Sequence, residues 1–211
     1  MGRTSDTKDK LIDSALELIG ARNYNTVGVQ ELCESAGVKK GSFYHFFPSK
    51  RDLTLEVLDE MWNQFKTQML DPVTQSDLSA MDKFNMLLTR AYEQHNSSKK
   101  CTGAMTGCCL GNLALELSTQ DEVIRQKIEH IFKQWAKYFE GLVEEAISEG
   151  SMPENTDSAA TAKAMLAYIE GISLLGKTFN EPELIRRIGD GVLKIFIKKK
   201  EHDRGNLEKT V

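Results

Sequence analysis

The sequence has little proline and lacks any convincing run of alternating β-branched side chains: only four of its 211 residues are proline. Apolar residues instead recur three or four positions apart, which is the spacing of helices rather than strands. We therefore expect an all-α fold. Long uncharged apolar stretches are also missing, since the most apolar late segment, residues 165–176, is short and contains Glu170. A membrane-spanning helix is not expected.

Cysteine is scarce, and the start of the chain lacks the features of a secretory signal. Residues 1–10 are charged and polar, without an apolar segment. The four cysteines are Cys33, Cys101, Cys108 and Cys109, and they lack C-x-x-C pairing. Reduced thiols and cytoplasmic localisation are the expectation. The ligand spacing does not suit zinc, so neither a metal ion nor a cofactor is expected.

Charge is present in balanced amounts, which excludes binding of polyanions by bulk charge alone. The chain carries 27 Lys and Arg against 31 Asp and Glu, a net charge of −4. Residues 1–52 hold eight basic and seven acidic residues, or +1, and the remainder is −5. Any contact with nucleic acid is therefore expected near the N-terminus.

Helical periodicity divides the chain into three parts. Residues 1–52 hold short helices, residues 53–199 hold longer ones, and residues 200–211 form a polar tail that we expect to be flexible. The expected helices cover about 6–22, 50–70, 79–95, 102–117, 121–149, 158–179 and 182–199, with two short helices on either side of Gly37.

Residues 26–50 carry a helix-turn-helix pattern, in which the second helix is too short to bury itself alone. Gly37 permits the backbone geometry that swings one helix across the other, and Val38 can fill the gap between them. Gly41 lets the backbone approach DNA, and Gly28 begins a supporting helix whose amides can face a phosphate. Donors and cations suited to phosphates and base edges follow on the second helix and its flank, at Lys39, Lys40, Ser42, Tyr44, His45 and Lys50.

The run A-G-V-K-K-G-S-F-Y-H-F-F-P-S-K, residues 36–50, resembles the DNA-binding signature of the tetracycline-repressor (TetR) family. The resemblance covers about residues 8–60. It implies a three-helix DNA-binding domain on residues 1–52. It also implies that residues 53–199 form a larger effector-binding domain, which dimerises through its last two long helices.

The resemblance also assigns roles to individual residues. Gln30 lies where the family often contacts a base, while Tyr44, His45 and Lys50 match phosphate contacts. Lys40, Gly41 and Ser42 fall on the recognition helix. Lys39 stands where the family commonly has a small residue or proline, and Asn23 where glycine is common, so no operator sequence follows. The alternative places Tyr44 and Phe43 in the core and treats Lys39 and Lys40 as a solvated face. For Phe43, Phe46 and Phe47 we expect core positions.

Two stripes in the last helices predict a dimer interface. Small residues recur at Ala160, Ala164, Ala167 and Gly171, which allows close helix approach. An apolar stripe follows at Leu184, Ile188, Val192 and Ile195. Together they fit a symmetric four-helix interface, although a contact within one chain would give the same pattern.

Aromatic and methionine side chains in the second domain suit an adaptable apolar pocket. The candidates are Trp62, Phe65, Met69, Met105, Trp135, Phe139, Met165 and Tyr168. Each of them also fits an ordinary core position.

The segment from Gly107 to Glu116 has the form G-C-x-x-G-N-x-x-x-E, which resembles one branch of the family. Some members of that branch respond to reactive electrophiles or oxidants, and Cys108 matches the branch's cysteine. A thiol near a helix N-terminus has a lowered pKa, which favours sensing. The lysines before Cys101 favour thiolate there too. The alternative is that Cys108 and Cys109 are small buried hydrophobes.

These patterns predict a dimeric transcriptional repressor and not an enzyme. The expected partners are a palindromic double-stranded DNA operator, a second copy of the chain, and an unidentified small-molecule effector; thiol modification is a second means of release. One alternative is a helical enzyme or thiol scavenger with Cys108 as nucleophile, which needs a nearby base that no motif supplies. The others are an activator and a protein-binding adaptor.

Overall fold

The computed structural model describes residues 2–196, apart from the side chains at positions 2–5, 21, 190 and 192–196. This part of the chain is helical and contains no strand, as predicted. Its elements are α1 Gly2–Ala21, η1 Tyr24–Thr26, α2 Val29–Ser35, α3 Lys40–Phe46, α4 Lys50–Phe65, η2 Lys66–Leu70, α5 Asp71–Thr74, α6 Ala80–Thr102, α7 Cys109–Leu117, α8 Glu122–Ser148, α9 Ser158–Phe179 and α10 Glu183–Phe196. No helix within residues 2–196 combines the length and the apolar composition needed to cross a membrane.

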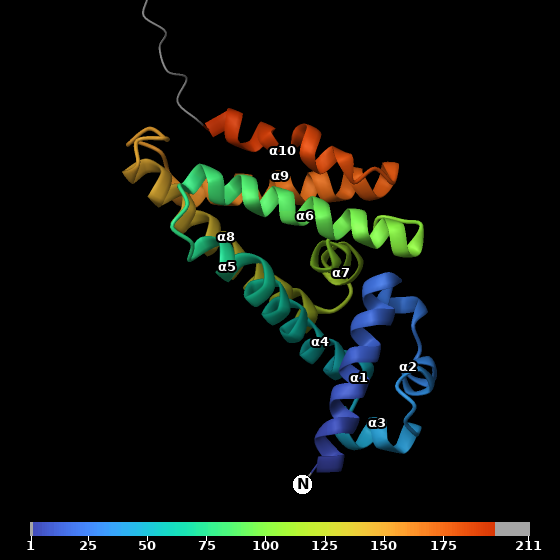
Figure 1. Cartoon of the computed structure of the whole chain (residues 1–211). Helices are drawn as coiled ribbons and strands as arrows, with labels where there is room; N and C mark the ends of the chain where they lie inside the picture. The colour runs from blue at the N-terminus through green and yellow to red at the C-terminus, as the bar shows by residue number, and fades with distance from the viewer. Residues whose placement is uncertain (1, 197–211) are drawn as a thin grey trace, which may run out of the picture.

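Helices α1, α2 and α3 pack together at one end of the molecule (Figure 1). The apolar face of α1 is buried at Leu11, Ala15 and Ile19. Phe43 of α3 is fully buried and Phe47 is 2% exposed, so their predicted core positions are confirmed, whereas Phe46 is only partly buried against the core. The short helices therefore gain their stability from a shared core rather than from their own length.

The turn between α2 and α3 depends on Gly37. Its φ of +66° lies in the left-handed region that favours glycine. This conformation lets the Val38 amide donate to the Cys33 carbonyl at 2.9 Å, which closes the end of α2. The helix-turn-helix geometry predicted around Gly37 is present.

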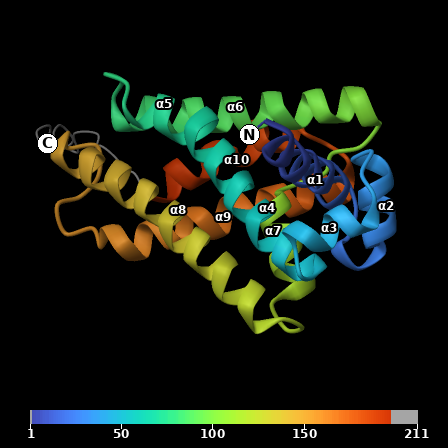
Figure 2. The same ribbon diagram turned by 90° about the horizontal axis from the view of Figure 1, so that it is seen from below.

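The larger helical part is a layered bundle. Helix α8 packs on α9, α10 packs on α9 and α6, and α4 packs on α8 (Figures 1 and 2). Helix α7 lies between this bundle and α1 (Figure 1). The predicted helix boundary at 199 and the tail 200–211 lie outside the described residues.

The boundary between α6 and α7 differs from the sequence prediction. Helix α6 continues past the expected loop at 96–98 and ends at Thr102, where Gly103 has φ +82° and donates to the Lys99 carbonyl. A helix starting at 102 was expected, but α7 begins only at Cys109. Gly107, with φ +72°, keeps this segment out of a helix. Cys108 is consequently the N-cap of α7.

The predicted helix 50–70 is interrupted by a π-helical turn, η2. Arg90 of α6 donates to the Gln68 carbonyl of this turn at 3.1 Å. Such turns are rare and recur at functional sites. Here the turn brings Gln68 and Met69 to the wall of a cavity.

One ion pair joins a buried lysine of the bundle to a partly exposed glutamate. Lys83 of α6 is 5% exposed, and its ammonium donates to the Glu145 carboxylate of α8 at 2.6 Å. A buried charge is costly without its partner, whereas the pair itself contributes little net stability.

We predict that Glu145→Gln lowers the free energy of unfolding by about 2 kcal/mol, because Lys83 then remains buried without a counter-charge. Lys83→Met should change it by less than about 1 kcal/mol, because no buried charge is left. Urea unfolding at a single protein concentration measures both. Equal losses in the two variants would show that the pair itself, rather than the stranded charge, sets the stability.

Candidate functional site

The outward face of α3 carries the predicted DNA-contacting side chains. Lys39, Lys40 and His45 are exposed, and Tyr44 is 52% exposed. The Tyr44 ring packs edge-on against Phe43, with ring centroids 5.1 Å apart. Buried Phe43 therefore fixes the direction in which the exposed side chains of α3 point. Gly41 is exposed with open space around it, and Ser42 is partly buried.

The two candidates on α2 are also accessible. Gly28 is the exposed N-cap of this helix. Gln30 is exposed and donates through its side-chain amide to Glu34 at 2.7 Å. This contact holds the Gln30 amide along the helix.

Lys50 has partners within the chain. Its ammonium donates to the Tyr24 carbonyl and lies 3.7 Å from the centroid of the Tyr24 ring. Burial lowers the pKa of Lys50, and the nearby Glu116 opposes this shift. A contact with phosphate, as the resemblance implies, would require Lys50 to exchange its Tyr24 contact.

The first half of the Gly107–Glu116 motif surrounds the thiol of Cys108. Cys108 caps α7, and its sulfur accepts from the Gly111 amide at 3.4 Å. A Cβ at Gly111 would lie 2.1 Å from Oε2 of Glu170, so the missing side chain makes room for this carboxyl group of α9. Glu170 follows from no local motif, and sequence reasoning missed it.

Asn112 ties the start of α7 to its surroundings. Its Nδ2 donates to the Thr106 carbonyl at 2.9 Å, and its Oδ1 accepts from Nζ of Lys177 at 2.9 Å. The side chain of Lys177 also packs against Gly107, within 3.3 Å of where a Cβ would be. The start of α7 is therefore anchored to α9.

The other end of α7 contacts the helix-turn-helix part of the molecule, which comprises α1, η1, α2 and α3. The Glu116 carboxylate accepts from the backbone amides of Tyr24 and Asn25, both at 2.8 Å. These amides open η1, the turn between α1 and α2. The sulfur of Cys109 also lies 3.9 Å from the Gly20 carbonyl of α1. Glu116 ends the motif in the sequence, but its partners, 92 and 91 positions away, were not predictable from it.

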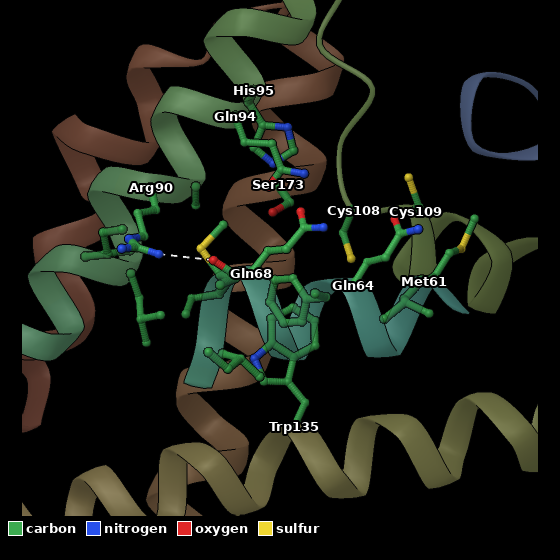
Figure 3. Close-up of a pocket in the computed structure, with 18 of the residues that line it drawn as sticks. Met61, Gln64, Gln68, Arg90, Gln94, His95, Cys108, Cys109, Trp135 and Ser173 are labelled. Atoms are coloured by element: carbon green, nitrogen blue, oxygen red, sulfur yellow. Dashed lines mark hydrogen bonds between the residues drawn. The ribbon is translucent and has the colours of Figure 1, made fainter. Parts of the chain in front are cut away.

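A cavity of about 790 Å³ lies between α4, η2, α6, α7, α8 and α9, with Leu16 of α1 at its wall. Four of the eight predicted pocket residues line it: Phe65, Met69, Trp135 and Phe139. Figure 3 shows Trp135 directed into this space from α8, with Cys108 and Cys109 on the α7 side. The wall also contains polar groups that the sequence analysis did not place there, at Gln64, Gln68, Arg90, Gln94, His95 and Ser173.

The other four predicted pocket residues lie elsewhere. Trp62 and Met165 belong to the main core, where Met165 is fully buried. Met105 packs in a separate buried cluster between α6, α9 and α10. Tyr168 packs beside these clusters and donates its hydroxyl to the Ile188 carbonyl at 2.8 Å. Aromatic and methionine content alone does not separate a cavity wall from a filled core.

The electrostatics of Cys108 correct the sequence expectation. Burial raises the pKa of the Cys108 thiol well above its usual value, and the neighbouring Glu170 raises it further. The Gly111 amide lowers this pKa but is outweighed. Burial likewise raises the pKa of Cys109, against the opposing charge of Lys177. The expected lowering at a helix N-terminus is therefore wrong for Cys108, which is a neutral thiol at neutral pH.

The face predicted to dimerise is open in the single chain. Ala160, Ala164 and Ala167 are exposed along α9, and Gly171 is partly exposed. The same helix continues with large exposed apolar side chains that sequence analysis missed: Leu174 at 50%, Leu175 at 42% and Phe179 at 61%. On α10, Leu184 and Ile188 are partly buried, while the side chains of Val192 and Ile195 lie outside the described residues.

An exposed helix-turn-helix joined to a larger helical domain is the architecture of a DNA-binding transcriptional regulator. Residues 11–57 match the family model described as bacterial regulatory proteins, tetR family. Residues 86–192 match the tetracyclin repressor-like C-terminal domain. The chain belongs to the TetR family of transcriptional regulators.

Individual relatives agree with this assignment. The transcriptional regulator AcuR of Cereibacter sphaeroides is 29% identical over 174 residues, covering 82% of this chain and 77% of the relative. The transcriptional repressor DhaR of a Mycobacterium species is 25% identical, covering 82% and 83%. A solved TetR regulatory protein from Rhodobacter sphaeroides superposes with a TM-score of 0.79 at 26% identity, covering 90% of this chain and 98% of that one.

We predict opposite effects for two glycine-to-alanine changes in helices. Gly111→Ala should lower the free energy of unfolding by about 1 kcal/mol, because its Cβ displaces the end of the Glu170 side chain. Gly141→Ala, in the interior of α8 with open space around it, should raise it by up to about 1 kcal/mol. Urea unfolding compares the two, and stabilisation by both changes would mean that Glu170 does not occupy this space.

Proposed function

We propose that this regulator is a homodimeric repressor that binds a palindromic DNA operator through α3. It releases the operator when a small molecule binds in the cavity or when a thiol on the cavity wall is modified. The observation that carries the proposal is the position of α7. Its N-terminal residues line the cavity, and its Glu116 accepts two backbone amides of the DNA-binding part.

The proposed DNA contacts are few and local. Residues 1–52 carry only +1, so binding rests on the exposed cations of α3 rather than on a broad basic field. A two-fold symmetric dimer presents two such helices, and simple helix-turn-helix dimers space them by about 34–36 Å, one turn of DNA. The repeat of half-sites in a palindrome mirrors this symmetry.

The proposed dimer contact uses the open face of α9. Its small residues permit close helix approach, and Leu174, Leu175 and Phe179 extend the face with exposed apolar surface. Scattered exposed apolar side chains are ordinary, but a continuous stripe along one helix marks an interaction surface. Helix α10 packs on α9 and supplies the second half of the four-helix contact.

The proposed switch needs two states that differ in affinity for the effector. A molecule in the cavity, or an adduct on Cys108, crowds the start of α7. Since the motif residues tie both ends of α7 to neighbouring helices, displacing its start shifts Glu116 relative to Tyr24 and Asn25. The DNA-binding parts then lose the orientation that matches the operator.

The DNA contact is tested with Lys40→Gln, since Lys40 is exposed on α3. We expect weaker binding to all DNA sequences alike and a salt slope, d log K/d log[salt], that is smaller by about 0.9, the value for one phosphate contact. Lys133→Gln, an exposed lysine on α8, is the matched control and should leave the slope unchanged. A fluorescence anisotropy salt titration measures both, and an unaltered slope for Lys40→Gln removes this lysine from the interface.

Release is tested by operator binding before and after treatment with N-ethylmaleimide. A Cys101→Ser background removes the exposed thiol. We expect alkylation to lower operator affinity about tenfold or more, within the range of allosteric couplings. Cys108→Ser should abolish the loss. The Glu116→Gln protein should still be alkylated at Cys108, but alkylation should lower its operator affinity much less than in wild type. Glu154→Gln, in an exposed loop, is the control and should behave as wild type.

Two outcomes would contradict this account. Equal release of wild type and Cys108→Ser would remove Cys108 as the sensor. An undiminished response in Glu116→Gln would show that α7 transmits nothing through its contact with η1.

A further inference from the structure

A carboxyl group from α9 lies against the cavity-lining thiol of Cys108. Oε2 of Glu170 lies 2.1 Å from the position that a Cβ on Gly111 would occupy. The Cβ of Cys108 lies 3.5 Å from the same position. The carboxyl group of Glu170 is thus a direct neighbour of the Cys108 side chain and acts on the pKa of its thiol. The second carboxyl oxygen, Oε1, is buried without a hydrogen-bond partner in the described part of the chain. A buried acceptor that lacks a partner is costly, so its retention requires an explanation.

Cys108 and Glu170 can hold only one negative charge between them. Burial raises the pKa of Glu170, an effect that the neighbouring Cys108 opposes. Burial and the charge of Glu170 together raise the pKa of Cys108. Two adjacent anions in this setting repel each other, so the sulfur can become a thiolate only if its proton goes to the carboxylate.

We propose that Glu170 is the proton acceptor that activates Cys108 toward α,β-unsaturated carbonyl compounds held in the cavity. The proposal rests on the thiol-modification arm of the proposed function. It also supplies the base that nucleophilic chemistry at Cys108 needs and that no sequence motif provided.

The reaction balances without an oxidant or a metal. The S–H bond of Cys108 breaks and its proton moves to the Glu170 carboxylate, while the sulfur electron pair forms a bond to the β-carbon of the electrophile. The electrons of the C=C bond move toward the carbonyl oxygen and give an enolate. Glu170 then returns the proton to the α-carbon, which leaves a thioether on Cys108 and restores the carboxylate.

Trp135 completes a site for such a compound. Its side chain is 5% exposed and lines the cavity, yet its indole N–H has no hydrogen-bond partner within the described residues. Figure 3 shows Trp135 and Cys108 on the walls of the same cavity. An unpaired donor in a largely apolar cavity favours a ligand that brings an acceptor, and a carbonyl oxygen that gains charge during the reaction meets this need.

Other ionisable groups surround the pair. Cys109 adjoins Cys108 on α7, and Lys177 lies on α9 with its charge acting on Cys109. Across the cavity, α6 contributes Arg90, Glu93 and His95. Burial lowers the pKa of His95, so this side chain is neutral near pH 7. Glu170 is the carboxylate that lies beside Cys108 at Gly111 and acts on the pKa of its thiol, which makes it the direct proton acceptor.

Glu170→Gln tests the proposal, because it keeps the shape of the side chain and removes the base. N-ethylmaleimide is the probe, and fragment mass spectra of the Cys101→Ser protein give the alkylation rate at Cys108. We expect the rate at pH 7 to fall about a hundredfold, the usual contribution of a general base. Glu154→Gln, which removes a carboxylate from an exposed loop outside the cavity wall, should leave the rate unchanged.

The pH profile separates a proton acceptor from a structural neighbour. The wild-type rate should rise as Glu170 ionises, level off, and rise again only as the thiol itself ionises. The first rise should be missing in Glu170→Gln. If Glu170 merely suppresses the thiolate, removing its charge lowers the pKa of Cys108 and the variant reacts faster, which would overturn the proposal. A wild-type profile without an acidic step would overturn it as well, even if the variant failed to fold.

Failure here is distinguishable from failure of the proposed function. Once fully alkylated at Cys108 by longer treatment, Glu170→Gln should release the operator as wild type does. Loss of release after complete alkylation would contradict the switch, whereas rapid alkylation with normal release would contradict the role of Glu170 alone.

Discussion

The contact between Glu116 and the backbone of η1 is the link on which the functional account depends. One carboxylate accepts two adjacent amides, from Tyr24 and Asn25, and Lys50 donates to the carbonyl of the same Tyr24. Hydrogen bonds to a charged group are stronger than neutral ones, and two on one acceptor fix direction as well as distance. The turn that carries α2 and α3 is thus held from two sides, so a movement of α7 is not absorbed by a loose loop.

Opposing electrostatic effects act on the pKa of Cys108, and the surroundings of the thiol determine which of them is larger. A helix N-terminus favours thiolate by its dipole and by the Gly111 amide, but that influence is modest. Burial and an adjacent carboxylate act in the opposite direction on the pKa of Cys108 and outweigh it. The outcome is a protected thiol whose reaction requires a proton acceptor. Selectivity then comes from which molecules reach the cavity, rather than from a thiol that reacts with any electrophile.

The sequence predicts the parts of this protein that depend on local patterns. Gly37, Phe43 and the exposed face of α3 follow from residues within one short segment, and the structure confirms that arrangement. Half of the predicted cavity residues were correct. Phe65 and Trp135 line the cavity, whereas Met165 lies in the core, because apolar character alone does not tell whether a side chain faces a cavity or a packed neighbour. The π-turn at Lys66–Leu70 and the start of α7 at Cys109 depend on tertiary packing. Glu116 and Glu170 act on partners far away in the chain, which no local pattern reveals.

The central claim is that α7 couples the cavity to the DNA-binding part through Glu116. Hydrogen exchange at the Tyr24 and Asn25 amides measures this contact directly, before and after alkylation of Cys108. The account predicts that both amides are protected in the unmodified protein and exchange faster once Cys108 carries an adduct, while the core amides of α1 do not change. Unchanged protection of both amides, in a protein that has lost its operator affinity, would contradict it.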